Sequence, residues 1–172
     1  MKNFSQESGR SMIEMLGVLA IIGVLSVGGI AGYSMAMSKF KTTKAIDEIQ
    51  TITTNVRTLV SAQRKWPKIK TTSVWYSLGV LTDEAGQNAL GGNVEIDTET
   101  GASTHDIVIT YTGVPKDACI KMATTDWGDS ANVKEIKIGS NAYNWTGNTL
   151  PVELTEAVGK CETTNTLVWS FK

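Results

Sequence analysis

The residue types that most often carry out chemistry in proteins are scarce in this sequence. It contains two cysteines, Cys119 and Cys161, and one histidine, His105. A structural zinc ion takes four nitrogen or sulfur ligands, so these residues alone do not form such a site. A catalytic thiol paired with His105 needs a third residue to orient the histidine, and the sequence marks none. In an exported domain a disulfide between the cysteines is favoured. We therefore predict no catalytic residues, no metal site and no cofactor.

The carboxylate of Glu14 also needs an explanation, because an apolar run begins directly after it. No charged residue occurs between Glu14 and Lys39, which leaves an uncharged segment of 24 residues. As a helix this segment would be roughly 36 Å long, enough for the ~30 Å hydrocarbon core of a membrane. A carboxylate drawn to the bilayer centre costs about 2.5–3.5 kcal/mol. Glu14 is therefore either an interfacial side chain or a contact for another chain.

The overall charge of the chain argues against one class of function, nucleic-acid binding. The net charge is −1, 19% of the residues are charged, and no basic block stands out. These values argue against a nucleic-acid binder that gains its affinity by counterion release. With 172 residues the chain has room for one domain of ordinary size plus an appendage.

The helix that begins in the apolar run is predicted to continue beyond it. No proline or glycine interrupts the sequence between Tyr33 and Trp66, so nothing stops a helix there. A helix over residues 11–62 would be about 75 Å long. Apolar residues in its second half recur at spacings of three and four, which predicts an amphipathic face, with Asp47 and Glu48 on other faces. The residues of this face are Ile46, Ile49, Ile52, Val56, Leu59 and Val60.

The remaining sequence contains strand signals. Runs rich in β-branched residues at 94–96 and 107–111 flank Gly101, which predicts a β-hairpin. A further strand is predicted at 133–138. The last one contains Leu167, Trp169 and Phe171 on one face, as expected of a half-buried strand.

Short helices are predicted between these strands. The segment "TSVWYSLG" is expected to form one, with Val74, Trp75 and Leu78 as its apolar contacts. Pro115 suits the first turn of another, and Gly159 is expected to end a third. The predicted fold class is α+β, a long N-terminal helix packed on an antiparallel sheet.

Several segments resemble a known family. The segment "GRSMIEMLGVLAIIGVLSVGGI" resembles the N-terminus of type IV prepilins, in which a glycine precedes the cleavage point and a glutamate is the fifth residue of the mature chain; Gly9 and Glu14 match these positions. The segments "NALGGNVEI", "ITYTGVPKDACIKMATTDWG" and "CETTNTLVWSF" resemble the globular domain of type IVb pilins. Together they cover most of the chain.

The resemblance implies a structural role without enzymatic activity. A prepilin peptidase would cut after Gly9, so that the mature chain begins at Arg10. The long helix would hold the chain in the bacterial inner membrane until assembly machinery polymerises identical subunits into an extracellular filament at the cell surface. Glu14 would then contact the amine of Arg10 in an adjacent subunit. The implied regions are a leader (1–9), a membrane and filament-core helix (10–38), its amphipathic continuation (39–66) and a globular head (67–172).

Some features depart from the family pattern. Arg10 stands where pilins usually have an apolar residue with a methylated amine, and the proline that kinks many pilin helices is absent. Gly28, Gly29 and Gly32 are the local weak points, since glycine costs about 1 kcal/mol against alanine within a helix. They are alternatively ordinary glycines of a membrane helix or a small-residue helix contact.

Rival functions share the same N-terminal anchor. One is a minor pilin or a type II secretion pseudopilin. Another, from a different class, is a membrane-anchored binding protein that does not polymerise.

Overall fold

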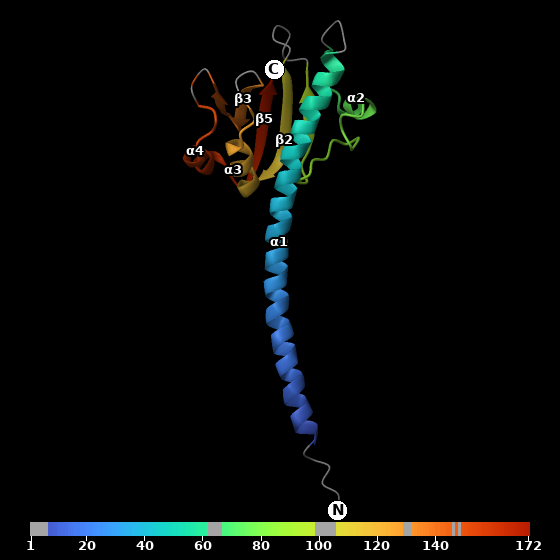
Figure 1. Ribbon diagram of the computed structural model, residues 1–172, viewed down its shortest axis with the longest axis vertical. Helices are drawn as coiled ribbons and strands as arrows, with labels where there is room; N and C mark the ends of the chain where they lie inside the picture. The colour runs from blue at the N-terminus through green and yellow to red at the C-terminus, as the bar shows by residue number, and fades with distance from the viewer. Residues whose placement is uncertain (1–6, 62–66, 99–105, 129–131, 146, 148) are drawn as a thin grey trace, which may run out of the picture. The chain divides into compact units, whose positions relative to one another are not determined.

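The computed structural model describes residues 7–61, 67–98, 106–128, 132–145, 147 and 149–172 (Figure 1). The chain divides into two compact units, Met1–Lys39 and Phe40–Lys172. Helix α1 (Glu7–Ser61) begins in the first unit and ends in the second. It starts four residues before the predicted position and is continuous to Ser61, as expected from the absence of proline. The last predicted residues of its amphipathic half, 62–66, lie outside the described residues.

The second unit is built on a five-stranded antiparallel sheet. The strands are β1 (Val94–Asp97), β2 (Ile107–Pro115), β3 (Val133–Ile138), β4 (Asn141–Asn144) and β5 (Thr164–Phe171). Their order is β1-β2-β5-β3-β4, so that β5 is central and β1 and β4 are the two edges. The predicted hairpin is present as the β1–β2 pair, in which Ile96 lies opposite Ile109. Its predicted turn at Gly101 lies outside the described residues.

The apolar face of α1 and one face of the sheet share a hydrophobic core. Ile49, Ile52, Val56 and Val60 are buried, whereas Ile46 and Leu59 are half-buried at the border of the core. From the sheet, β5 contributes its alternate residues, with Leu167, Trp169 and Phe171 buried as predicted. Burial of one such side chain stabilises a fold by about 1.5–3 kcal/mol. The core therefore holds the second half of α1 against the sheet.

Three short helices complete the unit: α2 (Thr72–Ser77), α3 (Lys116–Thr124) and α4 (Leu154–Lys160). The prediction of three apolar contacts from α2 was wrong in part. Trp75 is buried, but Val74 is 39% and Leu78 44% exposed, because a helix of fewer than two turns presents only a narrow side to the sheet.

Two predicted helix boundaries and one strand also differ. Pro115 is the last residue of β2 and caps α3 from an extended conformation, so it is not part of the first helical turn. Gly159 does not end α4, which continues to Lys160. Strand β4 was not predicted, since "NAYN" lacks the β-branched residues of typical strands. It forms by pairing with β3, in which Ile136 lies opposite Tyr143.

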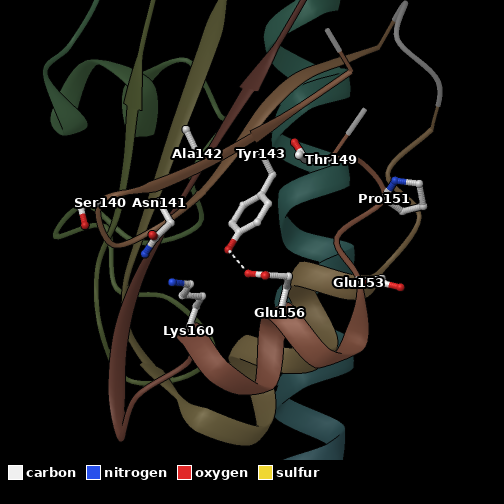
Figure 2. A pocket seen from close by; sticks show the side chains of 9 residues that line it. All are labelled: Ser140, Asn141, Ala142, Tyr143, Thr149, Pro151, Glu153, Glu156 and Lys160. Carbon is white, nitrogen blue, oxygen red and sulfur yellow. Dashed lines mark hydrogen bonds between the residues drawn. The ribbon is translucent and has the colours of Figure 1, made fainter. Parts of the chain in front are cut away.

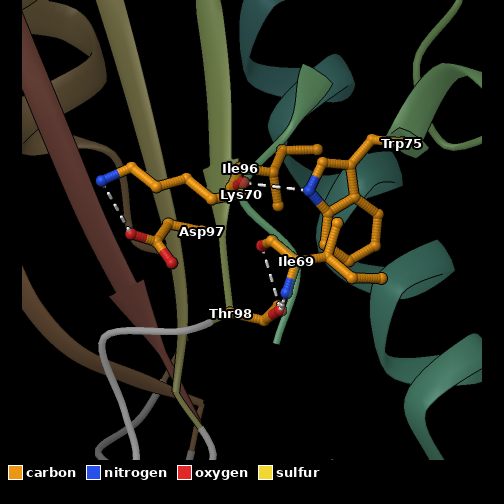
Figure 3. Close-up of polar contacts among 6 residues, drawn as sticks. All are labelled: Ile69, Lys70, Trp75, Ile96, Asp97 and Thr98. Atoms are coloured by element: carbon orange, nitrogen blue, oxygen red, sulfur yellow. Dashed lines mark hydrogen bonds and ion pairs between the residues drawn. The ribbon is translucent and has the colours of Figure 1, made fainter. Parts of the chain in front are cut away.

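The segment before α2 is fixed to the end of β1 (Figure 3). The Trp75 indole donates a hydrogen bond of 2.9 Å to the carbonyl of Ile96. Next to it, the backbone N–H of Thr98 donates to the carbonyl of Ile69 at 3.0 Å, and the N–H of Ile69 donates to the Thr98 hydroxyl at 3.0 Å. Lys70 forms a 3.6 Å ion pair with Asp97. These contacts set the position of α2 beside an edge strand.

Candidate functional site

The first half of α1 presents an apolar surface all round. Large apolar side chains from Met12 to Met35 are between 52% and 76% exposed. Two serine hydroxyls in this stretch bond to the helix itself, since Ser26 donates to the carbonyl of Ile22 at 2.7 Å and Ser34 to that of Ala31 at 2.9 Å. Among the described residues, α1 is the one helix long and apolar enough to cross a membrane. Such a surface needs a cover of lipid or of other protein chains.

Glu14 carries a carboxylate on this apolar surface. Its side chain is exposed, and it makes no hydrogen bond or ion pair with the described residues. Gly9 and Arg10 belong to the backbone of α1, with Arg10 one helical turn before Glu14. The structure therefore leaves the carboxylate without a stabilising contact inside the described part of the chain.

The glycines at 28, 29 and 32 lie within the continuous helix α1. A Cβ atom added to Gly28, Gly29 or Gly32 would meet nothing within 4 Å. Within one chain, then, none of these glycines is required for a close contact. Their predicted role as weak points of the helix stays a prediction.

A carboxylate on the second half of α1 makes a contact that the sequence did not predict. We expected Glu48 on a face away from the core, but its Oε2 accepts a hydrogen bond from the hydroxyl of Tyr111 on β2. The same oxygen accepts the backbone N–H of Ala89 at 3.3 Å. Burial of the Tyr111 ring, followed by the nearby Glu48 carboxylate, raises the pKa of the tyrosine hydroxyl well above its usual value.

This contact was missed because a helical wheel gives the direction of the Cα–Cβ bond and not the reach of a long side chain. One sequence signal was available. Tyr111 lies on the inward face of a predicted strand, and a buried tyrosine hydroxyl usually finds an acceptor. Glu48 is the acceptor, and it links α1 to β2 and to the loop that contains Ala89.

A second cross-link fixes the end of the same helix half. The guanidinium of Arg57 donates to the backbone carbonyl of Lys172 at 2.7 Å and to the side-chain carbonyl of Asn132 at 3.2 Å. These acceptors follow β5 and precede β3, the two strands that pair at the centre of the sheet. Arg57 therefore positions α1 across both strands.

The two cysteines are joined by a disulfide, the pairing that the sequence favours. Cys119 lies in α3 and Cys161 caps α4 at its C-terminal end, with 6.0 Å between their Cα atoms. Both side chains are buried. The bond joins α3 to the chain just before β5, across a sequence separation of 42.

A cavity lies between α4 and the edge strand β4 (Figure 2). It has a volume of about 640 Å³, and its lining is mostly polar. The hydroxyl of Tyr143 lies 3.5 Å from the Glu156 carboxylate across this cavity, and burial together with that carboxylate raises the tyrosine pKa. The lining residues are Ser140, Asn141, Ala142, Tyr143, Thr149, Pro151, Glu153, Glu156 and Lys160.

The described residues show no catalytic arrangement in this cavity. Its ionisable groups are two glutamates, one lysine and one tyrosine, and among the described residues no group of three or more His, Cys, Asp or Glu could hold a metal ion. His105, the other residue considered for thiol chemistry, lies outside the described residues.

Comparison with known proteins decides the family. Residues 39–172 match the family model described as PilS N terminal. The chain belongs to this family. It is also similar to the major structural subunit of bundle-forming pilus from Escherichia coli O127:H6 (strain E2348/69 / EPEC) and from Escherichia coli O111:H-. Each is 24% identical over 187 residues, which cover 99% of this chain and 97% of the relative.

Solved structures of pilins share the fold of this PilS-family chain. A type IV b pilin from Salmonella typhi aligns with a TM-score of 0.58 and 22% identity, over 73% of this chain and 95% of that one. TcpA, a type IV pilin from Vibrio cholerae El Tor biotype, aligns with a TM-score of 0.51 and 18% identity, over 76% of this chain and 97% of that one. The predicted fold class and the resemblance to type IVb pilins are confirmed. The curated relatives are structural subunits, in keeping with a chain that is not an enzyme.

Proposed function

We propose that this chain is a major subunit of a type IV pilus and polymerises through the first half of α1. The observation that carries the proposal is the exposed apolar surface between Met12 and Met35, in a chain related over nearly its whole length to major pilus subunits. A cover of lipid before assembly and of neighbouring helices afterwards would remove this surface from water in both states.

Processing at the N-terminus is part of the proposal. A prepilin peptidase on the cytoplasmic side of the inner membrane cuts after Gly9, and assembly machinery extracts the mature chain. Mass spectrometry of filaments should therefore find chains that begin at Arg10. Gly9→Val should accumulate uncut in the membrane, and uncleaved parent chains within filaments would contradict this step.

In this proposal the Glu14 carboxylate pairs with a neighbouring subunit and thereby fixes where each added subunit binds along the filament axis. In a filament core little water is available, so an unpaired carboxylate is strongly disfavoured and a cationic partner is required. Cleavage after Gly9 would create such a partner, the amine of Arg10, and the Arg10 side chain would add a second cation. The amine of an adjacent subunit can thus pair with the Glu14 carboxylate and set the axial register.

Electron microscopy of the host with and without the gene for this chain tests the filament role. Loss of the surface filaments on deletion, and their return on complementation, is the expected result. Unchanged filaments would favour a non-polymerising binding protein. Filaments that persist in reduced number, with this chain absent from their shafts, would favour a minor pilin or a pseudopilin.

A further inference from the structure

Three lysines and one phenylalanine gather around α1 just beyond its uncharged run. Phe40, Lys41 and Lys44 lie on α1, and Lys121 lies on α3; we call these four residues the basic collar. All four belong to the second unit and are exposed, Phe40 by 63%. Among the described residues of α1 in this unit, no other large apolar side chain is exposed.

The collar is assembled from two elements of the fold. The ammonium of Lys121 donates a hydrogen bond of 3.2 Å to the Thr43 hydroxyl, so that α3 lies beside this part of α1 (Figure 1). Phe40 and Lys44 are four residues apart and share one side of α1, with Lys41 on the adjoining side. Positive charge is therefore present on several sides of the helix at this level.

Positive charge exceeds negative charge in the collar. Lys41 and Lys44 form no ion pair with the described residues. The carboxylates that follow on α1, Asp47 and Glu48, lie farther from the apolar run than either lysine. On α3 two lysines accompany one carboxylate, Asp117. The collar is thus suited to a partner that carries negative charge.

The spacing along α1 brings the collar to the depth of lipid headgroups. In the proposed function the uncharged run crosses the membrane, and it ends at Ser38. Along the helix axis, Lys41 lies about 4.5 Å and Lys44 about 9 Å beyond this residue. The headgroup layer is roughly 5–7.5 Å thick on each side of the hydrocarbon core. Lysine side chains can extend toward it, and exposed phenylalanine is common at such boundaries.

An insertion signal does not explain these lysines. Lysine and arginine are normally enriched in the cytoplasmic loops of membrane proteins. In the proposed function the collar lies on the opposite side of the membrane, together with the head. Lysines in that place match the chemistry of anionic phospholipid headgroups, which attract basic residues close to the end of a membrane helix.

We propose that the basic collar binds anionic phospholipid headgroups of the inner membrane while the subunit is stored there. This contact rests on the proposed function, since it requires the head to lie at the membrane surface opposite to the cytoplasm. The lysines supply charge attraction, and Phe40 supplies an apolar contact at the boundary of the hydrocarbon. The contact holds the head at a defined depth, and it is released when the subunit leaves the membrane for a filament.

Lipid binding by the full-length chain tests the collar. The chain in neutral-detergent micelles is titrated with a short-chain phosphatidylglycerol, and binding is measured by microscale thermophoresis. Lys41→Gln, Lys44→Gln and Lys121→Gln should each weaken binding about fivefold, which corresponds to roughly 1 kcal/mol per lysine. The triple variant should bind about a hundredfold more weakly.

Two controls separate the collar from general charge effects. Phosphatidylcholine of the same chain length, which has no net charge, should bind the parent and the triple variant equally. Lys68→Gln makes the same change at an exposed lysine that precedes α2, and this variant should bind phosphatidylglycerol like the parent. Matching circular dichroism spectra verify that all variants are folded.

Three results would overturn the lipid contact. One is equal affinity of the parent for the two lipids, or unchanged phosphatidylglycerol binding by the triple variant. Another is displacement of the lipid by inorganic phosphate beyond that by chloride at equal ionic strength, which would indicate a site for free anions. The third is loss of filaments from the triple variant with unchanged lipid binding, which would assign the collar to contacts between copies. Because the titration needs no filaments, their absence from the parent would overturn the proposed function separately.

Discussion

Removal of the Tyr111 hydroxyl should destabilise the folded second unit by about 1.5–3 kcal/mol, the range for hydrogen bonds to charged groups. Tyr111 is fully buried, and its hydroxyl donates to the Glu48 carboxylate. In Tyr111→Phe the carboxylate keeps the Ala89 N–H at 3.3 Å and remains partly exposed. The loss should therefore stay within that range and below the cost of an isolated buried charge.

A double-mutant cycle separates this contact from general packing. Unfolding by urea is measured for the parent, Tyr111→Phe, Glu48→Ala and the double variant. A coupling energy above about 0.5 kcal/mol between the two positions is expected for groups in direct contact. The control is Tyr143→Phe, whose hydroxyl lies 3.5 Å from an exposed glutamate, at the limit of a hydrogen bond, so its effect should be smaller.

The pH dependence of stability gives a second measurement on the same residue. The pKa of Tyr111 is raised in the folded state from its ordinary value of 10.0, first by burial and then by Glu48. Above pH 10 the unfolded chain releases this proton while the folded chain retains it, so stability is fully present below pH 10 and falls as pH rises. The slope approaches about 1.4 kcal/mol per pH unit.

In Tyr111→Phe the free energy of unfolding should not show this decrease above pH 10, because the variant has no hydroxyl to titrate at this position. The difference in unfolding free energy between the parent and Tyr111→Phe should therefore shrink between about pH 10 and pH 11.5. Tyr143 is present in both proteins, so its own raised pKa cancels from the comparison. A coupling energy near zero between Tyr111 and Glu48, together with parallel pH profiles of the unfolding free energy for the parent and Tyr111→Phe, would refute a stabilising hydrogen bond between these residues.

Three further predictions concern other parts of the chain. Replacement of Cys119 and Cys161 by alanine should lower the unfolding free energy by about 4 kcal/mol in the chain-entropy model. An unfolding free energy, measured with denaturant, that lies within about 1 kcal/mol of the value for the oxidised parent would contradict this prediction. Glu14→Val should insert into the membrane and be processed normally yet yield few filaments when it is the sole copy, so normal pilus length would refute an assembly role. Gly92→Ala should lower the melting temperature measured by circular dichroism, because a Cβ there would meet the Thr112 carbonyl oxygen; an unchanged value would show that the backbone adapts.

Patterns with a short period were sufficient to predict much of the fold. The spacing of Ile49, Ile52 and Val56 predicted the buried face of α1, and the alternation of Leu167 and Trp169 predicted the inward face of β5. These predictions succeeded because helix and strand periodicities depend only on neighbouring residues. The uncharged run after Glu14 likewise indicated a helix with an exposed apolar surface. The resemblance to type IVb pilins rested on Gly9 and Glu14 together with the segments of the globular domain, and the family model matches residues 39–172, which contain those segments.

Contacts between segments far apart in the sequence were decided only by the tertiary structure. Nothing adjacent to Glu48 indicates that β2 will place the Tyr111 hydroxyl beside it, 63 positions along the chain. Strand β4 lacks a strong local preference and depends on its pairing with β3. The exposure of Val74 and Leu154 follows from where α2 and α4 pack at the two edges of the sheet. Local sequence thus determined which elements form and which faces are apolar, whereas sheet order and packing determined which of those faces remained exposed.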